Sequence, residues 1–226
     1  MAMKGRSALF ICNDIPAEEE DGFNDWYIRE HLPERANGLP GFNRGRRYKA
    51  LYDTPRYMAL YEVDGPDALQ SPEYLAIVRN PDPRSRRYIP MFERPIRTVF
   101  AVVATSGIGE GGVIGVLGYR PTPGTEADVR RRMAELVHGP LSTAPGIVAS
   151  HLLEKDETAL AASRTGHMRS GDRELPAALL VEAIDEPSLR ALRRGPLAEV
   201  RLAEAGIGDV QLFGVFSLLM TLTKGG

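Results

Sequence analysis

The chain has 226 residues, of which 43% are hydrophobic and 26% are charged, and its 28 Lys and Arg against 30 Asp and Glu give a formal net charge of −2. This balance predicts a packed globular protein and argues against a dedicated nucleic-acid binder, which needs a basic excess. The single cysteine, Cys12, excludes an internal disulfide framework and a cysteine-cluster zinc site. Because the longest apolar stretch, 212–222, is far shorter than the roughly 18 residues of a membrane span, we expect a cytoplasmic protein with no membrane partner.

Six predicted elements follow one another in the first half. They are a strand at 8–12, a helix ending at His31-Leu32-Pro33, a strand opened by Pro40-Gly41-Phe42, a strand at 57–63, a short helix after Asp64-Gly65-Pro66 and a closing strand at 98–103. Proline suits the first turn of a helix because an N–H at that position has no intrahelical partner. The Arg-rich stretch at 79–94, which contains Arg84, Arg86 and Arg87, is predicted to be a solvated loop.

The second half repeats this order. Its elements are a strand at 113–117, a helix ending at His138-Gly139-Pro140, a strand opened by Pro145-Gly146-Ile147, a strand at 177–183, a short helix after Asp185-Glu186-Pro187 and a closing strand at 212–219. Recurrence of six landmarks in one order predicts a tandem repeat of β-α-β-β-α-β. We therefore expect units at 1–106 and 112–226, joined by a Gly-rich linker at 107–111. The polar stretch at 155–173 is an insertion, predicted to lie on the surface.

The predicted strands do not alternate between apolar and polar residues. The runs at 8–12, 99–104, 177–181 and 212–219 are apolar at both parities, so both of their faces need cover. Helices can cover one face, and the sheet of the other unit can cover the second. The sequence therefore predicts an α+β fold in which two antiparallel sheets pack face to face within one chain. Because each unit already has its partner, we expect a monomer or a weak homodimer formed through outer surfaces.

Three segments of the first half carry a family resemblance. They are Asn24-Asp-Trp-Tyr-Ile-Arg-Glu-His-Leu-Pro-Glu-Arg35, Gly38-Leu-Pro-Gly-Phe-Asn-Arg-Gly-Arg-Arg-Tyr48 and Tyr57-Met-Ala-Leu-Tyr-Glu-Val63. Together they resemble the EthD-like group of the dimeric α+β barrel superfamily. The resemblance implies ferredoxin-like units, here fused as an intramolecular barrel, with a pocket between sheet and helices in each. It implies no single reaction, because the superfamily includes cofactor-free oxygenases, cyclases, isomerases and haem enzymes.

His31 is the main candidate for chemistry. Imidazole titrates near neutrality, and Phe23, Tyr27 and His31 lie four residues apart on one side of the predicted helix. We expect His31 to be partly buried at the mouth of a pocket; the alternative is a structural role at the end of the helix. The adjacent Glu30 is either a surface partner of Arg44 or Arg47, or a polar group of that pocket.

The second predicted strand adds cationic and phenolic candidates. Arg44 and Arg46 share one face of this strand and Arg47 lies on the other. An arginine in the pocket would suit a carboxylate or enolate, whereas a solvated strand edge is the alternative. The candidate catalytic residues are His31, Tyr27 and Glu30, and the candidate substrate-binding residues are Trp26, Arg44, Tyr48, Tyr57 and Tyr61. All belong to the first half, because the matching segments of the second half are rich in Ala, Val and Leu.

The motifs for common cofactors are incomplete. Gly107-Ile-Gly-Glu-Gly-Gly112 has dinucleotide-binding spacing, but a strand rather than a helix is predicted after it. No His/Cys cluster has the spacing of a metal site, and haem enters only by analogy with the superfamily, with His31 or His138 as axial ligand. Together with these residues, the EthD-like resemblance implies cofactor-independent acid/base chemistry (lyase, isomerase or oxygenase) on a carbonyl-containing or aromatic catabolic intermediate. The alternative is a non-catalytic small-ligand-binding or accessory protein.

Overall fold

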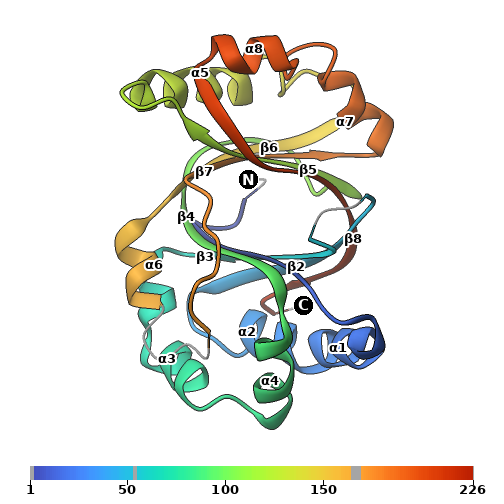
Figure 1. Cartoon of the computed structure of the whole chain (residues 1–226), viewed down its shortest axis with the longest axis vertical. Helices are drawn as coiled ribbons and strands as arrows, with labels where there is room; N and C mark the ends of the chain where they lie inside the picture. Colours follow the sequence, from blue (N-terminus) through green and yellow to red (C-terminus); the bar gives the residue numbers. More distant parts are fainter. Residues whose placement is uncertain (1–2, 53–54, 164–168, 226) are drawn as a thin grey trace.

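The computed structural model describes residues 3–52, 55–163 and 169–225. Eight antiparallel strands close into one barrel in the order β1-β3-β2-β8-β5-β7-β6-β4 (Figure 1). The strands are β1 (Ser7–Asp14), β2 (Phe42–Ala50), β3 (Tyr57–Val63), β4 (Glu93–Gly107), β5 (Val113–Pro121), β6 (Ile147–Lys155), β7 (Ala177–Ala183) and β8 (Ile207–Thr223). The first four come from the first half of the chain and the last four from the second half.

Helices cover the outside of the barrel. Those of the first half are η1 (Ala17–Glu19), α1 (Glu20–Trp26), η2 (Tyr27–His31), α2 (Leu32–Ala36), η3 (Pro66–Gln70), α3 (Pro72–Arg79), α4 (Pro83–Tyr88) and η4 (Ile89–Met91). Those of the second half are α5 (Glu126–His138), α6 (Glu157–Ser163), α7 (Glu186–Leu192) and α8 (Glu199–Glu204). In Figure 1, α1 to α4 lie below the barrel and α5, α7 and α8 above it. No helix among the described residues is long and apolar enough to cross a membrane.

The two halves are joined at both edges of their sheets. Within the halves the strand orders are β4-β1-β3-β2 and β8-β5-β7-β6, and the pairs β2–β8 and β4–β6 close the barrel. The strands are apolar at both parities because one face lines the barrel interior and the other packs under helices, as the interior and outer core clusters show. This confirms the predicted α+β fold of tandem ferredoxin-like units, and adds that their sheets are also hydrogen-bonded edge to edge.

Charged side chains cross one end of the barrel interior. Arg46 is fully buried, 2.9 Å from Glu62 on β3 and 2.6 Å from Glu182 on β7. His151 Nε2 lies 3.0 Å from the same Glu182 carboxylate, and its Nδ1 lies 2.8 Å from the Thr105 hydroxyl. Burial raises the pKa of Glu182, but its hydrogen bond to His151 and the charge of Arg46 outweigh burial and hold that pKa at about 2. This chain of charges, the barrel network, links strands of both halves.

Two stretches predicted to lie on the surface contain helices with buried residues. The prediction of a loop in the Arg-rich stretch was wrong, although Arg86 and Arg87 are exposed as expected. The Arg-rich stretch contains α4, in which Asp82 caps the helix by accepting from the Arg84 and Ser85 N–H groups and Tyr88 is buried. The insertion at 155–173 contains α6, whose Ala159 and Leu160 join the outer core of the first half. Residues 164–168 of that insertion lie outside the described residues.

Candidate functional site

His31 lies in a π-helical turn between α1 and α2. The Leu32 N–H donates to the Tyr27 carbonyl five residues earlier, and the next residue, Pro33, has no N–H to donate. Loss of that donor removes one bond of the regular helix and allows the wider turn. π-Turns inside α-helices are frequent at functional sites, and this turn carries both Tyr27 and His31 into the core.

The His31 ring is buried among aromatic rings. It is 5% exposed, and its ring centroid lies 4.3 Å from that of Trp26 and 4.7 Å from that of Tyr27. Its Nδ1 is buried without a hydrogen-bond partner among the described residues. Burial, together with the charges of Arg35 and Arg47, places the pKa of His31 well below its ordinary value. The imidazole is therefore neutral at pH 7, and its protonation is disfavoured in the free protein.

A cavity of about 50 Å³ adjoins His31 on the outer face of the first-half sheet. It is lined by Leu9, Ile11, His31, Arg35, Tyr74, Ile77, Val78, Pro81, Ile89, Phe92, Arg97, Arg169 and Asp172. We call it the His31 cavity. Arg97 is 3% exposed and donates to the Ser163 hydroxyl at 3.0 Å and the Tyr74 hydroxyl at 3.3 Å. The Nε and Nη1 atoms of Arg97 are buried and have no hydrogen-bond partner among the described residues. No described residue forms an ion pair with Arg97. The cavity therefore holds a positive charge not neutralised by a described carboxylate.

The second half completes the His31 cavity. Ser163, at the end of α6, binds the Arg97 guanidinium, and the Arg169–Asp172 ion pair forms part of the lining. The Arg97 backbone N–H also donates to the Arg173 carbonyl at 2.9 Å, so Arg173 lies beside β4. The insertion predicted to lie on the surface thus supplies part of this cavity.

Four of the predicted site residues share the outer face with His31. They are Trp26, Tyr27, Tyr57 and Tyr61, all in the outer core of the first half. The Tyr61 hydroxyl donates to that of Tyr27 at 3.4 Å. Burial raises the pKa of both phenols, which stay protonated at neutral pH. The Arg47 guanidinium lies 4.0 Å from the Tyr27 ring centroid and 4.7 Å from that of Tyr57, which explains how a cation is held in this aromatic region.

The other three predicted residues lie away from His31. Arg44 and Tyr48 point into the barrel, on the opposite face of the sheet, where Arg44 pairs with Glu62 and Glu110. Neither alternative for Arg44 holds, because β2 pairs with both β3 and β8 and has no solvated edge. The Glu30 side chain is 45% exposed and lies 2.6 Å from Arg84 of α4, so the expected partners Arg44 and Arg47 are also wrong.

Arg97, Arg35, Tyr74 and Ser163 were not among the sequence candidates. Arg97 had a detectable signal, since it is the charge nearest to the apolar run of β4 at 99–104. Its direction follows from the register, in which Arg97 lies opposite Ile11 of β1 on the helix-covered face. The contribution of Ser163 had no local signal, because it depends on where α6 packs.

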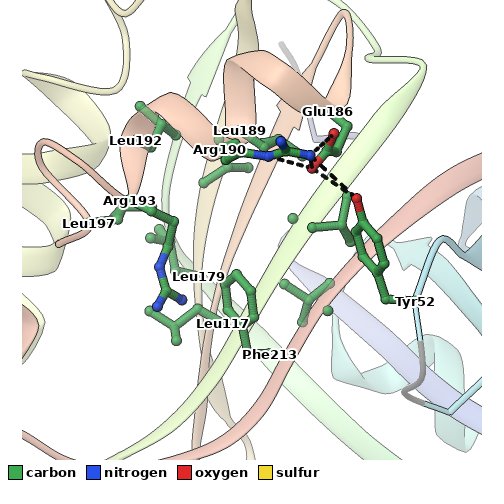
Figure 2. Close-up of a pocket in the computed structure, with 15 residues that line it drawn as sticks. Tyr52, Leu117, Leu179, Glu186, Leu189, Arg190, Leu192, Arg193, Leu197 and Phe213 are labelled. Atoms are coloured by element: carbon green, nitrogen blue, oxygen red, sulfur yellow. Dashed lines mark hydrogen bonds and ion pairs between the residues drawn. The ribbon is translucent and has the colours of Figure 1, made fainter. Parts of the chain in front are cut away.

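A larger cavity lies at the matching place in the second half. This second-half pocket has a volume of about 460 Å³, between α7 and the outer faces of β5, β7 and β8 (Figure 2). It is lined by Tyr52, Gly115, Val116, Leu117, Leu179, Val181, Glu186, Leu189, Arg190, Leu192, Arg193, Leu197, Phe213, Gly214 and Val215. Its volume lies within the roughly 300–1,000 Å³ typical of small-molecule sites.

The strand register explains why the two cavities differ. The pairs Ser7–Val63 and Val113–Ala183 are equivalent, so Gly115 matches Leu9 and Val181 matches Tyr61. The same register through β8 matches Phe213 with Arg97. The second half thus lacks two bulky side chains and replaces the buried cation with an aromatic ring. The second-half pocket is roomy and apolar where the His31 cavity is small and cationic.

The residues around the two cavities do not fit a haem. His31 faces a cavity of only about 50 Å³, and the exposed His138 is not among the residues of the second-half pocket. A haem needs both an axial ligand and a pocket that encloses its ring, and neither place combines them. Among the described residues no group of three or more His, Cys, Asp or Glu side chains is arranged to hold a metal ion.

Acidification is expected to destabilise the protein through His31. Because the pKa of His31 is lower in the folded chain than in the unfolded chain, the unfolded chain binds more protons below about pH 6.5. The free energy of unfolding is therefore not reduced by His31 above that pH, and it falls as the pH drops from about 7 to 5. Urea denaturation across this window should show a smaller loss for His31→Gln than for wild type. The exposed His138→Gln serves as control, and an equal loss in both variants would contradict a buried neutral His31.

Comparisons with solved structures support the fold over the whole chain. An anthrone oxidase-like protein matches with a TM-score of 0.67 and 12% identity, over 100% of this chain and 97% of its own. A candidate monooxygenase from Lactobacillus acidophilus NCFM matches with a TM-score of 0.60 and 9% identity, over 97% of each chain. A candidate chlorite dismutase matches with a TM-score of 0.60 and 12% identity, over 96% of each chain. No family model and no curated protein matches the sequence. At these identities the likeness establishes the dimeric α+β barrel fold and leaves the activity to the site.

Proposed function

We propose that this protein is an EthD-like enzyme that transfers protons in the His31 cavity without a cofactor. The observation that carries the proposal is a buried, neutral imidazole and a buried guanidinium, those of His31 and Arg97, in the lining of one cavity, where the guanidinium has no carboxylate partner among the described residues. A base next to a fixed positive charge suits the removal of a proton beside a carbonyl group.

The chemistry follows from the charges of the two groups. The His31 imidazole takes the proton from the carbon next to a carbonyl, and the C–H electron pair moves to the carbonyl oxygen as an enolate. The unpartnered N–H groups of Arg97 stabilise the negative oxygen. A substrate that brings negative charge beside His31 also raises the lowered pKa of the imidazole, which strengthens it as a base only when substrate is bound.

The size and charge of the cavity support one class of substrate. About 50 Å³ admits the reacting end of a molecule, and Arg97 favours a carbonyl that carries a carboxylate or becomes an enolate. The enolate then reacts further, by reprotonation in an isomerase, loss of a leaving group in a lyase or reaction with oxygen in an oxygenase. The anthrone oxidase-like and monooxygenase neighbours support the oxygenase branch.

A binding function without chemistry is the second candidate, and the lowered pKa of His31, which makes the imidazole a weak base, favours it. In that case His31 and Arg97 would only hold an anion, and the first half would act as a sensor or accessory module. The two functions differ in one observable. An enzyme exchanges the protons next to the carbonyl of its ligand with solvent, and a binding protein leaves them in place.

Proton exchange on simple carbonyl acids tests the proposal. Pyruvate and acetoacetate are incubated with the protein in D₂O, and deuterium incorporation beside the carbonyl is followed by NMR. His31→Gln should slow the protein-dependent exchange by about 10²- to 10⁴-fold, the usual contribution of a general base. His138→Gln, at the matching exposed position, should exchange as wild type does.

Two results would contradict the proposed enzymatic function. Exchange by His31→Gln at the wild-type rate would reject His31 as the base, leaving it a structural residue whose loss costs about 1 kcal/mol or less. Binding of either acid by wild type with no exchange would favour the binding function instead. Thermal melts of each variant show whether lost exchange reflects lost folding.

A further inference from the structure

The second-half pocket combines an apolar interior with charges confined to its mouth. Figure 2 shows α7 along one side, with Leu189 and Leu192, and Leu117, Leu179 and Phe213 near the strands. The three charged side chains in its lining, Glu186, Arg190 and Arg193, all come from the α7 segment. The interior therefore favours a hydrocarbon or aromatic body.

The charges at the mouth are unequal. Glu186 and Arg190 form an ion pair at 2.5 Å, and the Tyr52 hydroxyl donates to the Glu186 carboxylate at 3.1 Å. These two charges cancel. Arg193 lies with its guanidinium 4.4 Å from the Phe213 ring centroid, and no described residue offers it a carboxylate. One positive charge is thus left for a ligand at the edge of the apolar space.

The aromatic side chains at the mouth are exposed. Phe213 is 48% exposed and Tyr52 is 57% exposed, although both line the pocket. Exposed aromatic rings at the rim of an apolar cavity are typical of a ligand site. Phe213 stacked under Arg193 presents a ring face and a cation together, which suits a flat ring system that carries an acidic group.

From these features we propose that the second-half pocket binds an amphipathic organic anion, with its apolar body under α7 and its carboxylate or sulfonate on Arg193. Gly115 makes room for this body, since the equivalent first-half position is filled by Leu9. The site is separate from the His31 cavity and does not depend on the chemistry proposed there.

Fluorescence of 1-anilinonaphthalene-8-sulfonate, an aromatic sulfonate, measures the binding in the full chain. Arg193→Gln should weaken it by about three- to tenfold, because one charge-assisted contact at an exposed position is lost. Arg194→Gln removes the neighbouring exposed arginine, which does not line the pocket, and should bind as wild type does. Gly115→Leu should abolish binding by filling the pocket, and an added Cβ there meets Leu189 Cδ2 at an ordinary 3.4 Å.

A matched pair of competitors isolates the role of charge. In wild type, 2-naphthoate should displace the probe about three- to tenfold better than the neutral naphthalene-2-carboxamide, and this difference should vanish in Arg193→Gln. Equal weakening by the Arg193 and Arg194 variants, or equal competition by acid and amide in wild type, would overturn the proposal. Wild-type affinity in a folded Gly115→Leu would overturn the location. If that variant fails to fold, the comparison of the Arg193 and Arg194 variants and the competition between acid and amide still test the proposal.

Discussion

Arg46→Met is expected to lower the free energy of unfolding by about 3–5 kcal/mol, the usual result of removing one partner from a buried ion pair. Arg46 is the only cation that contacts both Glu62 and Glu182 among the described residues, and all three side chains are fully buried. Without it, two carboxylates remain in the barrel interior with reduced compensation. Urea denaturation at pH 7 measures the loss.

The matched control is Arg131→Met on the exposed face of α5. Arg131 also pairs with two carboxylates, Asp128 and Glu135, but all three side chains are solvated, so its loss should cost 1 kcal/mol or less. In Arg46→Met the pKa of Glu182 should also rise from about 2 towards its ordinary value of 4.5, so the stability difference between this variant and wild type should shrink as the pH falls below about 4.5. Similar losses in the two variants would show that the barrel network contributes little to stability.

Trp26→Ala is expected to cost about 3–5 kcal/mol of stability and to raise the pKa of His31. Trp26 is fully buried, and its ring contacts those of Phe23, Tyr27, Tyr88 and His31. Removal of the indole admits water beside the imidazole and relieves the burial that disfavours its charged form. NMR titration of the His31 ring protons measures the pKa directly.

Trp26→Phe separates the two effects. It keeps an aromatic ring beside His31, so the stability loss should be smaller and the pKa of His31 should stay low. If Trp26→Ala leaves this pKa unchanged while the protein stays folded, Arg35 and Arg47 rather than burial determine it, and the role assigned to the aromatic surroundings is wrong.

The barrel could be predicted because its signal is local and repeated. Strands such as 8–12 and 177–181 are apolar at both parities, which only a doubly covered sheet explains. The paired landmarks His-x-Pro, Pro-Gly and Asp-x-Pro then defined the order of elements. Closure of the barrel by β2–β8 and β4–β6 could not be predicted, because no residue pattern states which edges meet.

Only part of the candidate site followed from the sequence. Helical spacing correctly grouped Tyr27 with His31, and these lie with Tyr61 on one face. Arg44 and Tyr48 were assigned to the same pocket although strand alternation puts them opposite Arg47, which faces that side. Alternate residues of β2 point to opposite faces, but the helix packing decides which set faces the helices and which faces the barrel interior. The sequence of β2 alone does not show which set is which.

The two cavities depend on contacts distant in sequence. The His31 cavity needs Arg97 from β4 and Ser163 from α6, which the fold brings together from opposite halves. The second-half pocket needs Gly115 opposite Val181, a pair defined by strand register. The aromatic candidate residues all lie in the first half. The larger space arises in the second half because its side chains are small.

The shared edge strands also set the order in which the barrel can assemble during synthesis. β2 finds its second neighbour only when residues 207–223 have left the ribosome, and β4 only when residues 147–155 have emerged. Until then the nascent first half exposes two unpaired strand edges and the apolar face that later lines the barrel, both of which are templates for pairing with another chain. Neighbouring chains on one polysome can therefore exchange halves, so that β8 of one molecule completes the sheet of another and yields an interlocked dimer built from the same contacts as the monomer.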